Sequence, residues 1–137
     1  GDDIIYHTPG WDEEVRKEFS KDKHIMVATN DLYQRGKNIT LFFTHKKFHE
    51  ALWFYLSEKF RRWYTDTYLA EIFAGAGKIH YRDDIVTEHL HPDLYPERAD
   101  ETYKRMDSLK NPDKIYWNSD ENHSNIKKQV DMLKNLK

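Results

Sequence analysis

The sequence predicts a mixed α/β fold (α+β) with short strands, flanking helices and a charged C-terminal helix. Apolar runs of strand length alternate with segments whose apolar residues recur every three or four positions, and glycine or proline separates many of them. The 137 residues suffice for one domain. Aromatic residues make up 15% of the chain, a content that argues against disorder.

Composition narrows the function classes. The 22 basic and 24 acidic residues give a net charge of −2, so no strong electrostatic footprint for nucleic acid or anionic membrane is present. The absence of cysteine excludes disulfides and thiolate metal sites and fits a reducing compartment. No apolar run has the length of a membrane span, and no signal peptide opens the chain, so we expect a cytoplasmic protein.

The first third of the chain predicts a short strand, a helix and two further strands. Asp2 and Asp3 precede a β-prone run at residues 4–6, where two carboxylates can bind a hard cation or form a frayed, solvated terminus. A helix is predicted over residues 11–19, because its apolar side chains recur every four positions. Strands are predicted over 24–29 and 39–44.

Two polar residues follow these strands. Asp31 comes after the first, where turn chemistry explains it more simply than a functional role. His45 ends the second and precedes a predicted helix over residues 46–56. Side chains at strand-to-helix junctions often face clefts, which makes His45 a candidate, although a surface histidine is the commoner outcome.

The central stretch, residues 63–91, combines a carboxylate with two histidines. Thr65 or Asp66 is predicted to cap a helix that ends at the glycines of residues 75–77. Asp66 has a second interpretation, as a general base kept ionised by the helix N-terminus.

Beyond this helix we expect a strand over 78–81, a turn over 82–84 and a strand over 85–91. Strand alternation places His89 and His91 on one face, where two imidazoles can share a metal, or one can bind while the other buttresses it. An ordinary polar strand end is the alternative.

The last third changes character. A loop over 93–98, a helix over 99–109 and a helix break over 110–113 are expected. A charged helix over 115–136 has few apolar positions and is predicted to pack weakly on the domain or to extend from it. We therefore divide the chain into a catalytic-domain portion, 1–92, and a C-terminal loop and helical extension, 93–137.

An ordered set of short motifs runs over most of the chain. Its members are GDDI at 1–4, Trp11, TH at 44–45, WYTDT at 63–67, YRDDIVTEHLHP at 81–92 and DETY at 100–103. The set resembles the C-terminal part of a GT-A-type glycosyltransferase, and more narrowly a family of small glycosyltransferase-like proteins of bacteriophages and bacteria. The resemblance depends on the order of the motifs, because no single one is decisive.

This resemblance implies metal-dependent transfer of a sugar from a nucleotide-sugar donor to an acceptor hydroxyl. Asp2 and Asp3 would be the remnant of the Asp-rich DxD motif, which holds Mn²⁺ or Mg²⁺ against the donor's diphosphate. Asp66 would match the residue that deprotonates the acceptor in inverting members. His89 or His91 would match the late histidine that completes the metal site.

Asp2, His45 and Trp63 are the candidates for binding the nucleotide sugar or the acceptor. The family's upstream Rossmann-like half, which binds the nucleotide, is not within these residues, so the enzymatic expectation applies more securely to the parent protein. Two other classes stay open: a non-catalytic α/β interaction module, and a metal-dependent phosphoesterase that uses the same Asp and His residues.

Overall fold

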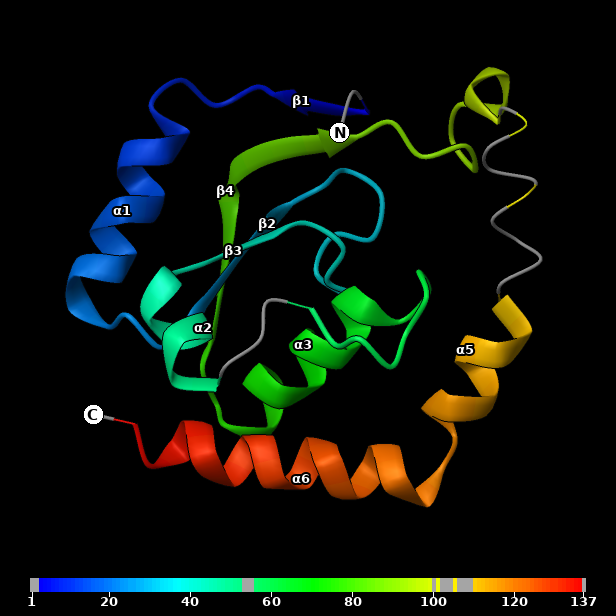
Figure 1. Cartoon of the computed structure of the whole chain (residues 1–137). Coiled ribbons are helices and arrows are strands. Elements are labelled where there is room, and N and C mark those ends of the chain that lie inside the picture. Colours follow the sequence, from blue (N-terminus) through cyan, green and yellow to red (C-terminus); the bar gives the residue numbers. More distant parts are fainter. Residues whose placement is uncertain (1–2, 53–55, 100, 102–104, 106–109, 137) are drawn as a thin grey trace.

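The computed structural model describes residues 3–52, 56–99, 101, 105 and 110–136, and it has helices flanking one four-stranded sheet (Figure 1). The strands are β1 (Ile4–Tyr6), β2 (Met26–Asn30), β3 (Phe42–Thr44) and β4 (Ile79–His89). The helical elements are α1 (Trp11–Lys21), α2 (Lys46–Leu52), α3 (Thr65–Gly75), the 3₁₀ turn η1 (Pro96–Arg98), α5 (Lys110–Trp117) and α6 (Asp120–Lys134). The predicted mixed α/β class is confirmed.

The strand order of the sheet is β1-β4-β2-β3. The central pair, β2 and β4, is parallel, whereas β1 is antiparallel to β4 and β3 is antiparallel to β2. The carboxyl ends of β2 and β4, at Asn30 and His89, therefore lie at the same edge of the sheet. Open α/β sheets bind ligands beyond this edge, so the topology indicates where a site forms.

Both faces of the sheet are buried, because successive side chains of β2 point to opposite sides. Met26 belongs to the core on the α2, α3 and α6 side, and Val27 to the core on the α1 side. The first core contains Phe48, Leu52, Phe60, Tyr68, Leu69, Ile72, Phe73 and Leu133. The second contains Val15, Ile25 and Ile85. The apolar sequence of β2 suits burial on both faces. Packing on both sides holds the carboxyl end of β2 in place.

Two predicted elements are shorter in the structure. The strand expected over residues 39–44 is reduced to β3, at Phe42–Thr44. The helix expected over 46–56 is α2, which ends at Leu52, and the three residues that follow lie outside the described part.

The strand β4 corrects the prediction of two strands joined by a turn at residues 82–84. Thr29 and Asn30 are neighbours on β2, but their partners on β4 are Arg82 and Val86, so the residues between these two bulge out of the ladder. A bulge lets a strand bend without ending. The two ladders of β4 run along the two sides of this bend: the longer one to β2 and a short one to β1.

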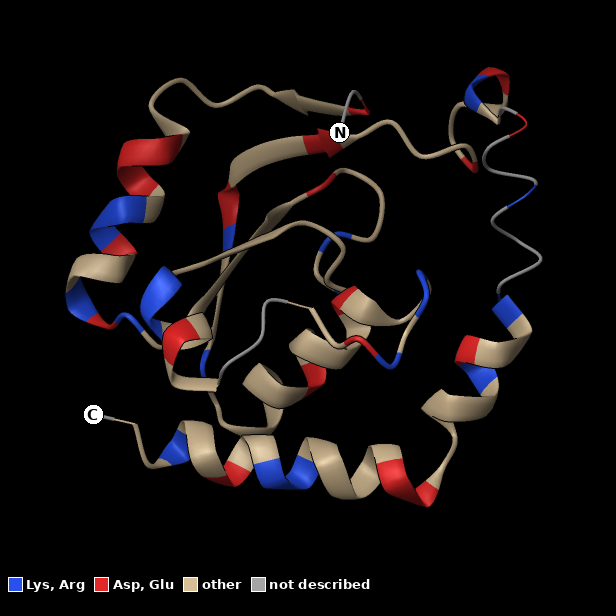
Figure 2. Cartoon of the chain, in the orientation of Figure 1, with Lys and Arg blue, Asp and Glu red and all other residues tan. Residues whose placement is uncertain are grey.

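Arg82 ties the bulge to α1. Its guanidinium donates to Asp84 at 2.7 Å and to Glu18 of α1 at 3.0 Å. The hydrogen bonds to Asp84, opposed in part by burial, raise the pKa of the Arg82 guanidinium above its ordinary value. Elsewhere acidic and basic residues are interspersed along α1 and α6 (Figure 2), so neither helix carries charges of one sign only.

The C-terminal segment also differs from the prediction. The expected break over residues 110–113 is the first turn of α5, and the expected single helix is divided in two. The Ser119 hydroxyl caps α6 by accepting the N–H of Asn122 at 3.2 Å, which explains where the second helix begins. The helix expected over 99–109 lies largely outside the described residues.

The helix α6 packs closely on α3, whereas weak packing on the domain or extension from it was expected. Leu133 is fully buried in the core that α3 lines. A Cβ added to Gly75 of α3 would lie 2.7 Å from Val130 of α6, so the two helices are in close contact at this glycine. The C-terminal helices are therefore part of the domain.

Candidate functional site

A cavity of about 660 Å³ lies beyond the carboxyl ends of β2 and β4, and we call it the site cavity. Its walls come from distant parts of the chain. They are Asp3, the loop after β2 (Tyr33, Gln34, Asn38 and Thr40), the segment leading into α3 (Arg62, Trp63, Tyr64, Thr65, Asp66 and Thr67), the end of β4 (His89 and His91) and the start of α5 (Lys110). A volume of several hundred Å³ is typical of small-molecule sites.

Asp3 and His89 meet at one end of the site cavity. The β1–β4 ladder pairs Ile4 with His89, and the N–H of Leu90 donates to the carbonyl of Asp3 at 2.8 Å. The Asp3 Oδ2 atom consequently lies 3.3 Å from His89 Nε2. Two ligands of one metal ion are about 3 Å apart, because each bond is about 2.0–2.2 Å. The pair therefore has the spacing of two ligands of a shared cation.

Within the described residues, the Asp3–His89 pair lacks two features of a complete metal site. These are a hydrogen bond to the second ring nitrogen of the histidine and a third protein ligand. His89 Nδ1 is buried and has no hydrogen-bond partner in the described part of the chain. Across the same residues, no group of three or more His, Cys, Asp or Glu side chains is arranged to hold a metal ion. Any cation here would take its other ligands from water or a bound anion.

His91 lies beside His89, with 5.2 Å between the ring centroids. Its ring stacks on Tyr33 at 4.5 Å, and its Nδ1 accepts the N–H of Asp93 at 3.1 Å. Burial lowers the pKa of His91 below its usual value, although the nearby Asp93 opposes this effect. With Nδ1 engaged in this way, His91 has the contacts of a buttress for the cavity wall.

Asp66 faces the site cavity from the second residue of α3. The prediction that Thr65 or Asp66 caps this helix is wrong: the N-cap is Tyr64, whose φ is +66° and which makes no side-chain cap. The backbone turns before the predicted position, so both residues lie inside the helix. Asp66 Oδ1 accepts the N–H of Thr67 at 2.8 Å. Its carboxylate is thus held by the first turn and directed at the cavity.

Trp63 supplies an aromatic surface and its neighbours supply cations. The ammonium of Lys110 lies 5.1 Å from the centroid of the Trp63 ring, which is cation–π distance. Arg62 lines the same wall. The site cavity therefore has Asp3, His89 and His91 among its walls, and a tryptophan with two basic side chains elsewhere around it.

Two buried carboxylates that the sequence did not assign to the site hold its walls. Asp31 accepts the N–H groups of Tyr33, Gln34 and Arg35 at 2.8–3.0 Å. Its other oxygen accepts the Thr40 hydroxyl at 2.7 Å, so turn chemistry does account for Asp31. The second carboxylate, Asp113 of α5, accepts the N–H groups of residues 61–63. No sequence signal pairs Asp113 with that segment.

One predicted site residue, His45, does not join the cavity. His45 follows β3, which is antiparallel to β2, so it lies at the opposite edge of the sheet. There its Nδ1 accepts the N–H of Lys47 at 3.1 Å, and its ring contacts Phe19. Asp2 lies outside the described residues.

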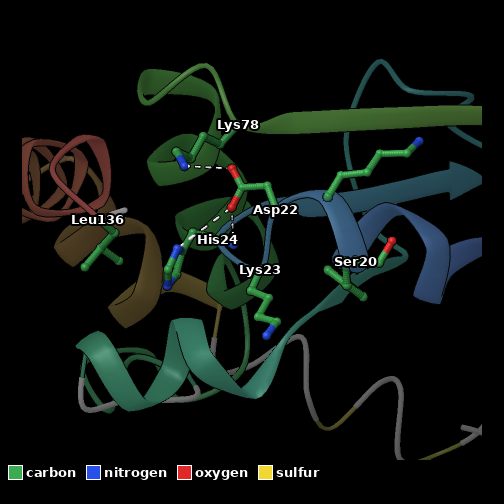
Figure 3. Close-up of a pocket in the computed structure, with 8 residues that line it drawn as sticks. Ser20, Asp22, Lys23, His24, Lys78 and Leu136 are labelled. Carbon is green, nitrogen blue, oxygen red and sulfur yellow. Dashed lines mark hydrogen bonds and ion pairs between the residues drawn. The ribbon is translucent and has the colours of Figure 1, made fainter.

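A second cavity, of about 410 Å³, lies near the carboxyl end of α1 (Figure 3). Asp22 accepts from Lys78 at 2.9 Å and from the backbone of His24 at 2.7 Å, while Lys23 points away from it (Figure 3). Burial alone would raise the pKa of Asp22, but these hydrogen bonds hold it below its usual value. The carboxylate is already neutralised and a helix carboxyl end disfavours anions, so the site cavity is the better candidate.

No family model, curated protein or solved structure matches this chain. Among the described helices, none is both long and apolar enough to cross a membrane.

Proposed function

We propose that the chain is part of a GT-A-type glycosyltransferase that transfers a sugar from a nucleotide-sugar donor to an acceptor hydroxyl. The observation that supports this most is that the Asp3–His89 pair, Asp66 and Trp63 line one cavity although they come from three separate segments. In such a transfer, the Asp3–His89 pair would bind the cation, the Asp66 carboxylate would act as the base, and Trp63 would contact the sugar ring. In the family that the sequence resembles, an upstream half binds the nucleotide, and we assign donor binding mainly to that half.

Asp3 and His89 are the residues that would hold the cation. A bound Mn²⁺ or Mg²⁺ neutralises the charge that develops on the leaving nucleoside diphosphate. One carboxylate and one imidazole favour Mn²⁺, because nitrogen ligands suit it better than Mg²⁺. The other ligands would come from the donor's diphosphate and from water.

Asp66 is the base in this proposal. The acceptor oxygen forms a bond to the anomeric carbon, the bond from that carbon to the diphosphate oxygen breaks, and the acceptor proton moves to the Asp66 carboxylate. The Asp66 carboxylate lies in the first turn of α3 and faces the site cavity, where an acceptor hydroxyl would bind. Trp63 provides a flat apolar surface for a sugar ring, and Arg62 and Lys110 provide positive charge for anionic groups of the substrate. The absence of cysteine suits a cytoplasmic setting for the enzyme.

One observation favours a different class. The carboxylates of Asp31 and Asp113 accept backbone N–H groups of the fold, as expected for a non-catalytic interaction module whose Asp and His side chains are structural. Such a module would bind no Mn²⁺ at the Asp3–His89 pair.

Titration with Mn²⁺, followed by electron paramagnetic resonance, separates the two classes. We expect the Asp3→Ala and His89→Ala substitutions to weaken Mn²⁺ binding at least about 10-fold. Asp131→Ala and His123→Ala, which change exposed residues of α6, serve as matched controls and should leave the affinity unchanged. Absence of Mn²⁺ binding by the unsubstituted chain would overturn the proposal in favour of the module.

The role of Asp66 is tested by turnover of nucleotide sugars by the parent protein in the presence of Mn²⁺. Asp66→Asn keeps the size of the side chain and removes the base, so the rate should fall by about 10² to 10⁴ while the Mn²⁺ affinity is retained. An unchanged rate would remove Asp66 from the mechanism.

A further inference from the structure

We propose that Asp113, a residue of the C-terminal helix α5, is the positioning residue for the wall of the site cavity that carries Trp63 and Asp66. The structural part of this inference is independent of the reaction. Its catalytic consequence depends on the proposed function. It gives the C-terminal helices a role in the site that their sequence does not suggest.

Asp113 is 1% exposed, and its carboxylate accepts three backbone N–H groups. Its Oδ1 accepts the N–H of Arg61 at 3.0 Å, and its Oδ2 accepts the N–H groups of Arg62 and Trp63 at 3.0 and 2.8 Å. We call residues 61–63 the RRW loop. Three consecutive amides on one carboxylate fix the loop backbone, because hydrogen bonds to a charged acceptor are the strong ones.

Aromatic contacts hold the same segment against α5. Tyr64 stacks on Trp117 with 5.2 Å between the ring centroids and 13° between the planes. Phe60 meets the edge of Tyr116 at 5.2 Å. Asp113, Tyr116 and Trp117 all belong to α5. This one helix therefore holds the RRW loop and the aromatic residues on either side of it.

The residue after the loop is strained. Tyr64 has a φ of +66°, a left-handed conformation that is unfavourable for a bulky side chain. Such a conformation persists only where its surroundings over-determine it, and it is concentrated at functional sites. These surroundings are the hydrogen bonds of the RRW loop to Asp113, on the N-terminal side of Tyr64, and the stack on Trp117.

Fixing this turn fixes the direction of Asp66. α3 begins at Thr65, whose hydroxyl donates to the carbonyl of Arg62 at 3.1 Å, and Asp66 is the next residue. A loop released from Asp113 would free both the Trp63 ring and the first turn of α3. The metal end at Asp3 and His89 is held by the β1–β4 ladder and would not move.

The test compares Asp113→Asn with wild type by amide hydrogen exchange, Mn²⁺ titration and nucleotide-sugar turnover. An asparagine has one acceptor oxygen in place of two, so at least one of the three amides loses its acceptor. We expect exchange of the RRW-loop amides to rise about 10-fold or more, while β2 and β4 stay protected. Asp131→Asn, at an exposed position of α6, is the matched control for the lost charge.

The functional readouts separate positioning from general stability. We expect Mn²⁺ affinity to stay within about 3-fold of wild type and the rate at saturating donor to fall at least about 10-fold, because about 1 Å of misplacement at the reacting groups is costly. A rise in exchange across the whole chain, or unchanged exchange of the RRW loop, would overturn the inference. A changed loop with an unchanged rate would overturn its catalytic part. Failure of the proposed function is seen separately, as a wild-type parent protein that neither binds Mn²⁺ nor turns over nucleotide sugars.

Discussion

The two walls of the site cavity are held in the same way, but from very different distances along the chain. In the Asp31 loop, residues 31–40, the carboxylate is part of the loop and accepts N–H groups two to four residues further on. In the RRW loop the carboxylate belongs to Asp113, 50 to 52 residues away. Both carboxylates are almost fully buried, at 2% and 1% exposure.

The difference teaches which parts of the site can form alone. Closing a turn of four residues orders little chain, so the Asp31 carboxylate finds its donors within its own loop. Contacts of Tyr33 with His91 and Asp93 add support from the segment after β4. The RRW loop needs α5 in place, and α5 is connected to α6, which packs on α3. One wall is thus a local structure, and the other is a consequence of the complete fold.

The largest effect is expected from Asp113→Ala. The substitution leaves three backbone N–H groups without their acceptor, and it should lower the free energy of unfolding by about 3 kcal/mol. Urea denaturation followed by circular dichroism measures it. Asp131→Ala, on the exposed face of α6, should change stability by less than about 0.5 kcal/mol. A loss for Asp113→Ala as small as this control would mean that the RRW loop does not depend on α5.

Asp31→Ala should cost less, about 2 kcal/mol, although Asp31 accepts one more hydrogen bond. The loss is limited because this loop can open locally, without separating two elements of the fold. Amide exchange should show faster opening of the Asp31 loop with the RRW loop unchanged, whereas Asp113→Ala should do the reverse. Exchange that rises in both loops for either variant would show that the walls are coupled.

A third substitution tests the contact of α6 with α3, through which the C-terminal helices pack on the domain. Gly75→Ala adds a Cβ that would lie 2.7 Å from the Val130 side chain. The gain in helix propensity offsets part of this clash, so a net loss of about 1 kcal/mol is expected. Val130→Ala in the Gly75→Ala background should recover stability, because it removes the clashing methyl groups. No recovery would mean that the strain is not at this contact.

The same division explains what the sequence could predict. Asp31 was interpreted correctly as a turn residue because its donors are its neighbours. Asp66, His89 and Trp63 were selected from local patterns and a resemblance, and the structure brings them to one cavity. The adjacency of Asp3 and His89 could not be calculated from the sequence, since it depends on the pairing of β1 with β4.

The failures have the opposite origin. His45 has the local pattern of a site residue, but the antiparallel direction of β3 places it at the other edge of the sheet. Asp83 and Asp84 have the composition of a turn, but they lie within β4. Pairing of β4 with β2 and β1 keeps the strand continuous. The proline before Asp113 predicts a helix break, whereas the role of Asp113 depends on a loop that is far away in sequence. Tertiary contacts decided each of these cases.

The smallest expected effect is a pH dependence confined to the local wall. Burial holds the pKa of His91 below its ordinary value of 6.5, so the folded state favours the neutral imidazole. The stabilisation that follows is present above pH 6.5 and is lost as the pH falls through the lower, folded-state pKa. Because the His91 ring stacks on Tyr33 at 4.5 Å, its protonation should loosen the Asp31 loop and leave the RRW loop, which is held by α5, unchanged.

Amide exchange at pH 7.5 and pH 5, corrected for the intrinsic rate, measures the difference. His91→Phe retains an aromatic ring that can stack on Tyr33 and has no proton to gain, so it should abolish the pH dependence of the Asp31 loop; if the dependence survives, another group causes it. Equal loosening of both walls in wild type would contradict the division between a wall held locally and a wall held from a distance.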